Sequence, residues 1–172
     1  AIMLTGPRQV GKSTLFKHLF STVNQVTFDD DLLLAQAEDD MNLFLLNNPC
    51  PLMIDEIQKC PAIFNKLKIT LDNIDTYGNF YLTGSQKLQL MEGVSESLAG
   101  RVSVVELEGL SLREIYTVPF TKHFIPTENY LKEREGAIRI YSEKLWETIN
   151  RGSYPELYSN TDKERSIFIS PM

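Results

Sequence analysis

The sequence predicts an α/β fold, because short apolar runs alternate with longer segments of helical spacing. The apolar runs have the length of strands and lie at residues 2–5, 25–28, 52–54, 79–83 and 102–107. The segments with helical spacing lie at residues 13–20, 32–46, 62–74 and 87–98. Parallel strands need crossover connections of this kind, so the alternation favours a mostly parallel sheet with helices on both faces.

The length and composition of the chain are those of an ordinary globular protein. Its 172 residues suffice for one domain with a core, or for one domain with a small appendage. No apolar run approaches the ~20 residues of a membrane span, and the N-terminus does not resemble a secretory signal. We therefore expect a cytoplasmic protein without membrane contact. The net charge of −6 argues against a broad nucleic-acid-binding face on this part of the protein.

The first strand leads directly into a glycine-rich stretch. Residues 6–13 read GPRQVGKS and fit the pattern G-x-x-x-x-G-K-[ST], after a strand and at the start of a helix. Main-chain N–H groups of such a loop bind phosphate oxygens, Lys12 would reach the β- and γ-phosphates, and the Ser13 hydroxyl would bind Mg²⁺. We therefore expect a nucleotide to be held by Gly6, Pro7, Arg8, Gln9, Val10, Gly11, Lys12, Ser13 and Thr14.

An acidic pair follows the third strand. The apolar run Leu-Met-Ile ends in Asp55 and Glu56, at the carboxyl edge where open α/β sheets bind their ligands. Asp55 would hold Mg²⁺, and Glu56 would orient or deprotonate an attacking water. Such residues also cap helices, but the phosphate-binding loop favours the functional interpretation.

Two further residues are candidates for catalysis. Ser85 follows the fourth strand and would lie at the same sheet edge, where it could contact the γ-phosphate or the water; a plain helix cap is the alternative. Arg101 stands at the start of the last strand. In a ring or dimer it would reach a neighbour's γ-phosphate, and the alternative is that it neutralises the negative end of a helix.

The second half of the chain departs from the alternation. Residues 118–134 carry Pro119 and Pro126 among mixed charges, which is typical of a linker or excursion. Residues 141–150 and 161–169 have helical spacing, and no further strand is expected. We therefore expect a core at residues 1–117, a linker or excursion at 118–140, and a helical segment at 141–172.

The motifs GPRQVGKSTL, FDDD, LMIDEIQKCP, FYLTGSQKL, SLAGRV and RGSYPEL occur in this order over residues 1–158. This succession resembles the bacterial and archaeal AAA+-type P-loop ATPases whose full-length members continue into a DUF4143 domain. The resemblance implies an AAA+ core with a five-stranded parallel sheet, ATP and Mg²⁺ as ligands, Asp55 and Glu56 as the Walker B pair, and Ser85 at the sensor 1 position.

The resemblance also implies a lid. Residues 152–155 match the lid motif in which Pro155 packs near the adenine, although Ser153 stands where family members more often have a second glycine. Members of the family carry a helical segment before the first strand and extend beyond the point where this sequence stops. The chain is therefore expected to be an ATPase module truncated at both ends, and a missing C-terminal domain would bind any nucleic-acid or protein client.

These residues support two functions. The first is hydrolysis of ATP to ADP and phosphate with Mg²⁺, in which the nucleotide state changes a lid or partner contact, with a homo-oligomer as one arrangement. The alternative is a nucleotide-binding regulatory or interaction module with little intrinsic hydrolysis. A small-molecule kinase is disfavoured because residues 110–150 hold no arginine cluster, and GTP is disfavoured because no Asn-Lys-x-Asp string occurs.

Overall fold

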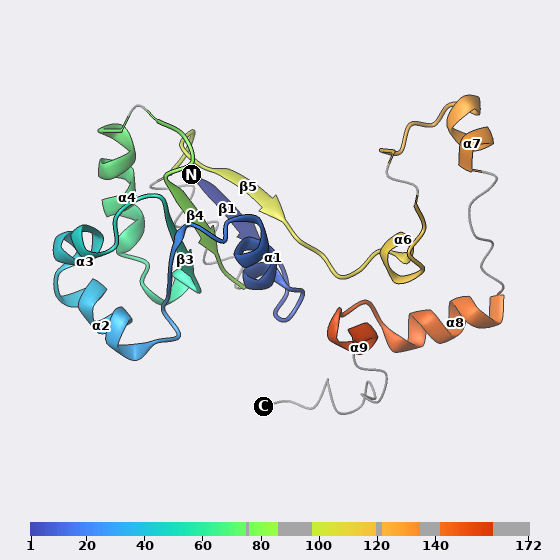
Figure 1. Ribbon diagram of the computed structural model, residues 1–172, viewed down its shortest axis with the longest axis horizontal. Coiled ribbons are helices and arrows are strands. Elements are labelled where there is room, and N and C mark those ends of the chain that lie inside the picture. The colour runs from blue at the N-terminus through green and yellow to red at the C-terminus, as the bar shows by residue number, and fades with distance from the viewer. Residues whose placement is uncertain (75, 86–97, 120–121, 135–141, 160–172) are drawn as a thin grey trace. The chain divides into compact units, whose positions relative to one another are not determined.

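The computed structural model describes residues 1–74, 76–85, 98–119, 122–134 and 142–159 (Figure 1). The chain divides into two compact units, Ala1–Glu108 and Gly109–Met172, and each is described by itself. Within the described ranges, no helix combines the length and the apolar character needed to cross a membrane.

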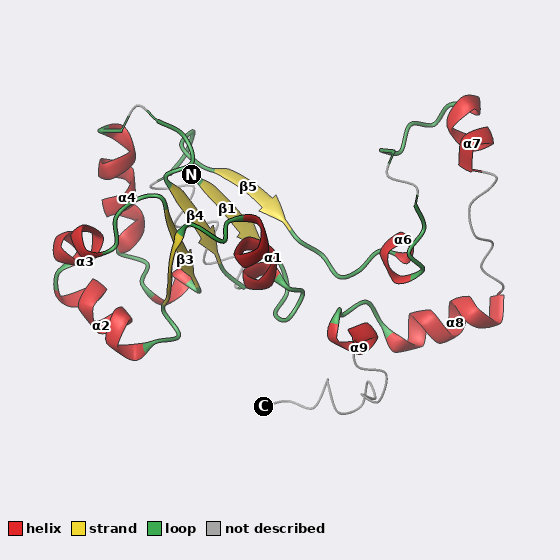
Figure 2. Ribbon diagram, in the orientation of Figure 1, coloured by secondary structure: helices red, strands yellow, loops and turns green. Residues whose placement is uncertain are grey.

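The first unit is built on a five-stranded sheet (Figure 2). Its strands are β1 (Ile2–Thr5), β2 (Asn24–Thr27), β3 (Leu52–Asp55), β4 (Phe80–Thr83) and β5 (Ser103–Glu106). They lie in the order β2-β3-β4-β1-β5, and every neighbouring pair is parallel. The predicted α/β class with a parallel sheet is therefore confirmed. In this order β4 lies between β1 and β3, so the carboxyl ends of these three strands are neighbours.

Helices cover both faces of this sheet, as the apolar strands require. Helix α1 (Lys12–Leu19) covers one face, where Phe16 packs with Leu4 and Met53. The opposite face is covered by α2 (Asp31–Asp39), α3 (Met41–Asn47) and α4 (Ile63–Asp72). There, the largest fully buried side chains of the core include Phe28, Phe44, Phe64, Phe80, Leu52, Ile54, Ile63, Leu67 and Leu82.

The single helix predicted at residues 32–46 is two helices in the structure. Asp40 ends α2 and begins α3, and its backbone is extended, with φ −140° and ψ 94°. Its carboxylate accepts hydrogen bonds from the main-chain N–H groups of Asn42 at 2.9 Å and Leu43 at 3.0 Å. The apolar periodicity runs through both helices, but a capping aspartate with satisfied N–H donors starts a new helix at this position.

The second unit contains short helices. They are α6 (Leu112–Ile115), α7 (Glu128–Arg134), α8 (Ser142–Arg151) and α9 (Glu156–Ser159). Helix α8 corresponds to the helix predicted at 141–150. Helix α7 lies within the predicted linker or excursion and was not expected there; its Tyr130 is buried and packs edge-to-face on Phe124 at 5.5 Å. The helix predicted at 161–169 and most of that predicted at 87–98 lie outside the described residues.

Candidate functional site

The loop between β1 and α1 depends on glycine at both ends. Gly6 has φ +141° and Gly11 has φ +95°, values that L side chains rarely adopt. At Gly6 the space is also closed, because an added Cβ would lie 2.0 Å from the carbonyl oxygen of Leu107. The Leu107 N–H donates to the Thr5 carbonyl at 2.8 Å, so the end of β5 lies directly against the start of the loop.

No side chain caps the N–H groups in the first turn of α1, and the space beside Gly11 is open. Gly11 occupies the N-cap position, no side chain caps the helix, and its first turn contains no acidic residue. An added Cβ on Gly11 would meet no described atom within 4 Å. Free N–H groups and the positive end of the helix dipole at an open position suit an anion such as phosphate.

The side chain of Lys12 folds back into the loop and bonds to its main chain. Its side chain is only 6% exposed, and Nζ donates to the main-chain carbonyls of Gly6 at 3.0 Å and Pro7 at 2.6 Å. Burial lowers the pKa of Lys12, while the negative charges of Glu56 and Asp55 act in the opposite sense. The structure thus brings the loop lysine into the field of both predicted carboxylates.

The remaining residues of the loop differ in exposure. Val10 is buried and anchors the loop in the core, and Ser13 is half-buried in the first turn of α1. Four of the predicted nucleotide-binding residues are exposed: Pro7, Arg8, Gln9 and Thr14. Gln9 has φ +65°, a left-handed conformation that is uncommon for a residue other than glycine. The middle of the loop, at residues 7–9, is therefore accessible to a ligand.

Asp55 is oriented by the neighbouring strand. Its Oδ1 accepts hydrogen bonds from the hydroxyl of Thr83, at the end of β4, and from the N–H of Glu56 at 3.2 Å. Thr83 is fully buried, so its hydroxyl holds the carboxylate in one orientation. We did not predict a role for Thr83, although the polar string that ends the fourth strand pointed to this position.

Glu56 turns the chain sharply at the end of β3. Its backbone is left-handed, with φ 54° and ψ 42°, and it begins the short helix η1 (Ile57–Lys59). Ile57 is fully buried and anchors this turn in the core. The Glu56 Oε2 accepts a hydrogen bond from the Ser85 hydroxyl at 3.4 Å, so the structure brings together these two predicted site residues.

Gln58 joins the same cluster, which sequence reasoning missed. Its Nε2 donates to the Glu56 carboxylate and lies 3.5 Å from the Ser85 Oγ. Its Oε1 is buried and accepts no hydrogen bond within the part of the chain that the structure describes. The one signal in the sequence was the position of this glutamine two residues after the acidic pair.

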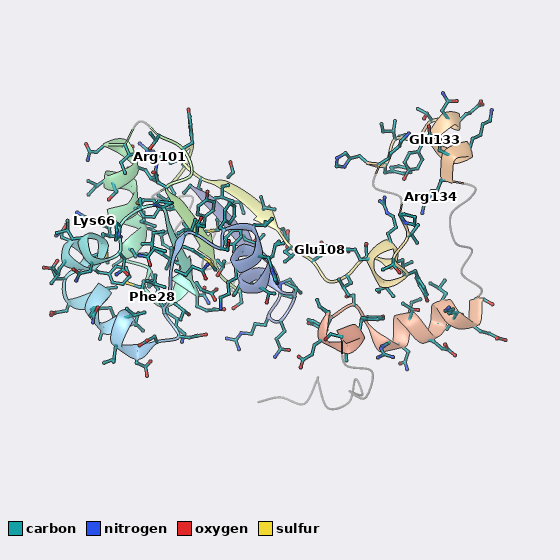
Figure 3. The ribbon with its side chains drawn as sticks, viewed as in Figure 1. Phe28, Lys66, Arg101, Glu108, Glu133 and Arg134 are labelled. Carbon is teal, nitrogen blue, oxygen red and sulfur yellow. The ribbon has the colours of Figure 1, made fainter. Side chains whose placement is uncertain are left out.

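Arg101 lies at the end of the sheet where β1 and β5 begin, opposite the end that carries the loop, Asp55 and Glu56. Its guanidinium forms a two-point ion pair with Asp72, at the end of α4, and donates to the Ala99 carbonyl at 3.2 Å. These hydrogen bonds from Arg101 lower the pKa of Asp72. The chain's N-terminal amine donates to the Arg101 carbonyl at 2.8 Å, which places both groups at the amino ends of β1 and β5 (Figure 3). The structure therefore does not bring Arg101 to the loop, Asp55 and Glu56 of its own first unit.

Pro155 lies in the second unit. Gly152 has φ +93°, and its carbonyl accepts a hydrogen bond from the Tyr158 hydroxyl at 2.7 Å. The Ser153 carbonyl accepts from the Leu110 N–H at 2.7 Å, and the Pro155 carbonyl accepts from the N–H groups of Tyr158 and Ser159, both at 3.0 Å. The stretch thus has a defined turn with serine at position 153, while an adenine contact of Pro155 stays a prediction.

The donor set limits how a metal ion could be held. The described residues contain no group of three or more His, Cys, Asp or Glu side chains arranged to hold a metal ion. Mg²⁺ commonly takes only one or two protein ligands and completes its shell with phosphate oxygens and waters. One hydroxyl and one carboxylate, from Ser13 and Asp55, fit that requirement.

Comparisons with known proteins identify the family of the first part of the chain. A family model described as an AAA domain matches residues 1–116. Two uncharacterized proteins, from Mycobacterium bovis and Mycobacterium tuberculosis, are each 37% identical to this chain over 115 residues. The matched region covers 66% of this chain and 26% of each relative, so it spans about a quarter of the length of these curated relatives.

Proposed function

The chain belongs to the AAA domain family, and from this we propose that it binds ATP and hydrolyses it to ADP and phosphate. The observation that carries the proposal is the placement of Lys12. Its ammonium closes the loop from inside, and the charges of Asp55 and Glu56 act on it. A phosphate-binding lysine and an acidic pair in one site are the groups that phosphoryl transfer to water requires.

The loop and the first turn of α1 would bind the phosphates. The uncapped N–H groups would donate to phosphate oxygens, and Lys12 would exchange its carbonyl partners for the β- and γ-phosphates. The exchange is favourable because a phosphate oxygen carries charge and a carbonyl oxygen does not. Arg8 and Thr14 are exposed on the same loop and helix and would contact the outer face of the nucleotide.

Ser13 and Asp55 are the residues that would hold Mg²⁺. The ion would supply positive charge to the β- and γ-phosphate oxygens. Thr83 fixes Asp55 through Oδ1, which leaves Oδ2 for the metal or for its water shell.

Glu56 is the proposed general base. It accepts a proton from the attacking water while the water oxygen forms a bond to the γ-phosphorus. The bond between the γ-phosphorus and the bridging oxygen breaks, and that oxygen leaves with ADP. Ser85, which donates to Glu56 at 3.4 Å, would hold the carboxylate in place or contact the γ-phosphate.

We further propose that the nucleotide state acts on a lid or a partner. Residues 1–117 would form the ATPase core, 118–140 the linker or excursion, and 141–172 the helical lid segment with Pro155 near the adenine. The lid motif is built around Gly152, whose positive φ permits the turn between α8 and α9. Movement of this turn with loss of the γ-phosphate would couple hydrolysis to a change elsewhere in the protein.

One observation favours the second function, a nucleotide-binding module with little intrinsic hydrolysis. Arg101 is paired with Asp72 at the amino edge of the sheet, away from its own subunit's acidic pair. An isolated chain would then lack the arginine that stabilises charge on the transferred phosphate. Hydrolysis in that case would require a neighbouring subunit to supply Arg101.

The deciding experiment compares Glu56→Gln with the exposed control Glu38→Gln. Calorimetry with ATP, ADP and GTP in the presence of Mg²⁺ measures binding, and phosphate release measures turnover. We expect both variants to bind adenine nucleotides as the wild type does and not GTP, with turnover lost only in Glu56→Gln. Undiminished turnover in Glu56→Gln would overturn the assignment of the base, and a folded wild type that binds no nucleotide would overturn the function.

A further inference from the structure

Only the NH₂ group of the Gln58 carboxamide forms hydrogen bonds with residues that the structure describes. Its Nε2 donates to the Glu56 Oε2 and lies 3.5 Å from the Ser85 Oγ. Its Oε1 is buried, yet it accepts no hydrogen bond from any residue that the structure describes. Buried acceptors are nearly always paired, so an unpaired one beside two candidate catalytic residues points to a missing donor.

The orientation of the amide follows from the chemistry of its neighbour. An ionised carboxylate only accepts hydrogen bonds, so the NH₂ group of Gln58 must face Glu56. The carbonyl oxygen shares a carbon with that nitrogen, and it cannot form a hydrogen bond with the ionised carboxylate because both groups only accept. A water has two protons, so it can donate to the Gln58 Oε1 and to the Glu56 carboxylate at once.

The backbone turn fixes the positions of the Glu56 and Gln58 side chains relative to each other. Glu56 is left-handed, and the fully buried Ile57 separates it from Gln58. The turn is closed by hydrogen bonds from the Lys59 N–H to the Glu56 carbonyl at 3.0 Å and from the Cys60 N–H to the Ile57 carbonyl at 3.1 Å. Because Ile57 anchors the turn, Glu56 and Gln58 both project from it toward Ser85, two residues beyond the end of β4.

We propose that Gln58 positions the attacking water together with Glu56. One proton of that water faces the Glu56 carboxylate, the other is donated to the Gln58 Oε1, and the oxygen lone pair is left to face the γ-phosphorus. Gln58 gains and loses no proton; Glu56 alone accepts one. This inference rests on the proposed hydrolysis of ATP, and it assigns Gln58 a positioning role within that reaction.

The kinetic test uses Gln58→Leu, with Gln36→Leu on the exposed surface of α2 as the matched control. We expect Gln58→Leu to lower kcat by about tenfold or more, since water-positioning and proton-transfer groups contribute at least that much. The KM and the calorimetric Kd for ATP should stay unchanged, because Gln58 contacts the water and not the nucleotide. In the background of Glu56→Gln, the Leu substitution should cause no further loss, because both residues act on one water.

A second variant and a structural readout separate this proposal from folding defects and from the proposed function. Gln58→Met keeps the length of the side chain and should reproduce the loss of kcat with an unchanged unfolding temperature. A structure with a non-hydrolysable ATP analogue should show a water within about 3 Å of the Gln58 Oε1. Wild-type kcat in the folded Leu and Met variants, or a protein donor on Oε1 in that structure, would overturn the proposal. ATP binding without turnover in the wild type would instead overturn the proposed function.

Discussion

The ammonium group of Lys12 occupies the interior of its own loop. There it is shielded from water, which lowers its pKa, and it bonds to two uncharged carbonyls, those of Gly6 and Pro7. A buried cation with only neutral hydrogen-bond partners is stabilised when an anion binds next to it. The motif predicted the contact of this lysine with phosphate, whereas its internal bonding in the free loop required the structure.

Replacement of Lys12 by alanine should weaken binding of ATP with Mg²⁺ by about 100-fold, since a hydrogen bond to a charged group contributes roughly 1.5–3 kcal/mol. The exposed Lys17, on the same helix, gives the control Lys17→Ala, which should bind as the wild type does because Lys17 lies outside the loop. Calorimetry checks both variants. Equal affinity of Lys12→Ala and the wild type would show that the ammonium does not contact the nucleotide.

Polar side chains cap the starts of α2, α3 and α6, whereas α1 and α4 begin without a side-chain cap. Asp30 and Asp40 each accept two main-chain N–H bonds, and the second of them splits the helix predicted at 32–46. Ser111 and Glu114 form a reciprocal capping box on α6, with the Glu114 Oε2 accepting from the Ser111 N–H at 2.7 Å and from its hydroxyl at 2.8 Å. Caps of this kind stabilise helices too short to persist alone.

The capping box predicts a pH-dependent stability. Hydrogen bonds from the backbone and side chain of Ser111 hold the pKa of Glu114 below its ordinary value of 4.5. The contribution is therefore complete above the ordinary pKa and is lost as the pH falls through the lowered one. Ser111→Ala should lower the free energy of unfolding by about 1 kcal/mol at pH 7, and the difference should shrink at pH 3. Urea unfolding at both pH values checks this, with Glu147→Gln on α8 as the control; a difference independent of pH would contradict it.

The strand order decides which residues of the first unit meet at the ends of its sheet. Because β4 lies between β1 and β3, the loop after β1, the acidic pair after β3 and Ser85 after β4 share one edge. Arg101 precedes β5 and lies at the other edge, about 10 Å away along strands of this length. A role for Arg101 in hydrolysis would therefore be exerted on a neighbouring subunit.

Turnover per chain should accordingly rise with protein concentration, because each site would need the arginine of another subunit. Arg101→Ala should remove this rise and leave the Kd for ATP unchanged, while Arg134→Ala, on α7, should behave as the wild type. Phosphate release over a dilution series, with molar mass measured in parallel, checks the prediction. A constant, near-zero rate at every concentration would favour the nucleotide-binding module.

The parts of the site that sequence reasoning found and missed differ in their physical origin. Lys12 and Asp55 belong to local strings whose spacing reflects a strand, a turn and a helix start. The contact of Gln58 with Glu56 is local, two residues along the chain. Thr83 and Gln58 were missed because the other contacts that place them in the site cross strands, with Asp55 in one case and with Ser85 in the other. No spacing within one string encodes such contacts.

The sequence by itself determined the α/β class, and it predicted the phosphate-binding loop and the acidic pair, because each depends on a few neighbouring residues. Only the tertiary structure decided that Ser85 and Gln58 converge on Glu56 and that Arg101 lies at the far edge of the sheet. Those outcomes follow from the order and direction of the strands, and that order is set by packing across the whole sheet.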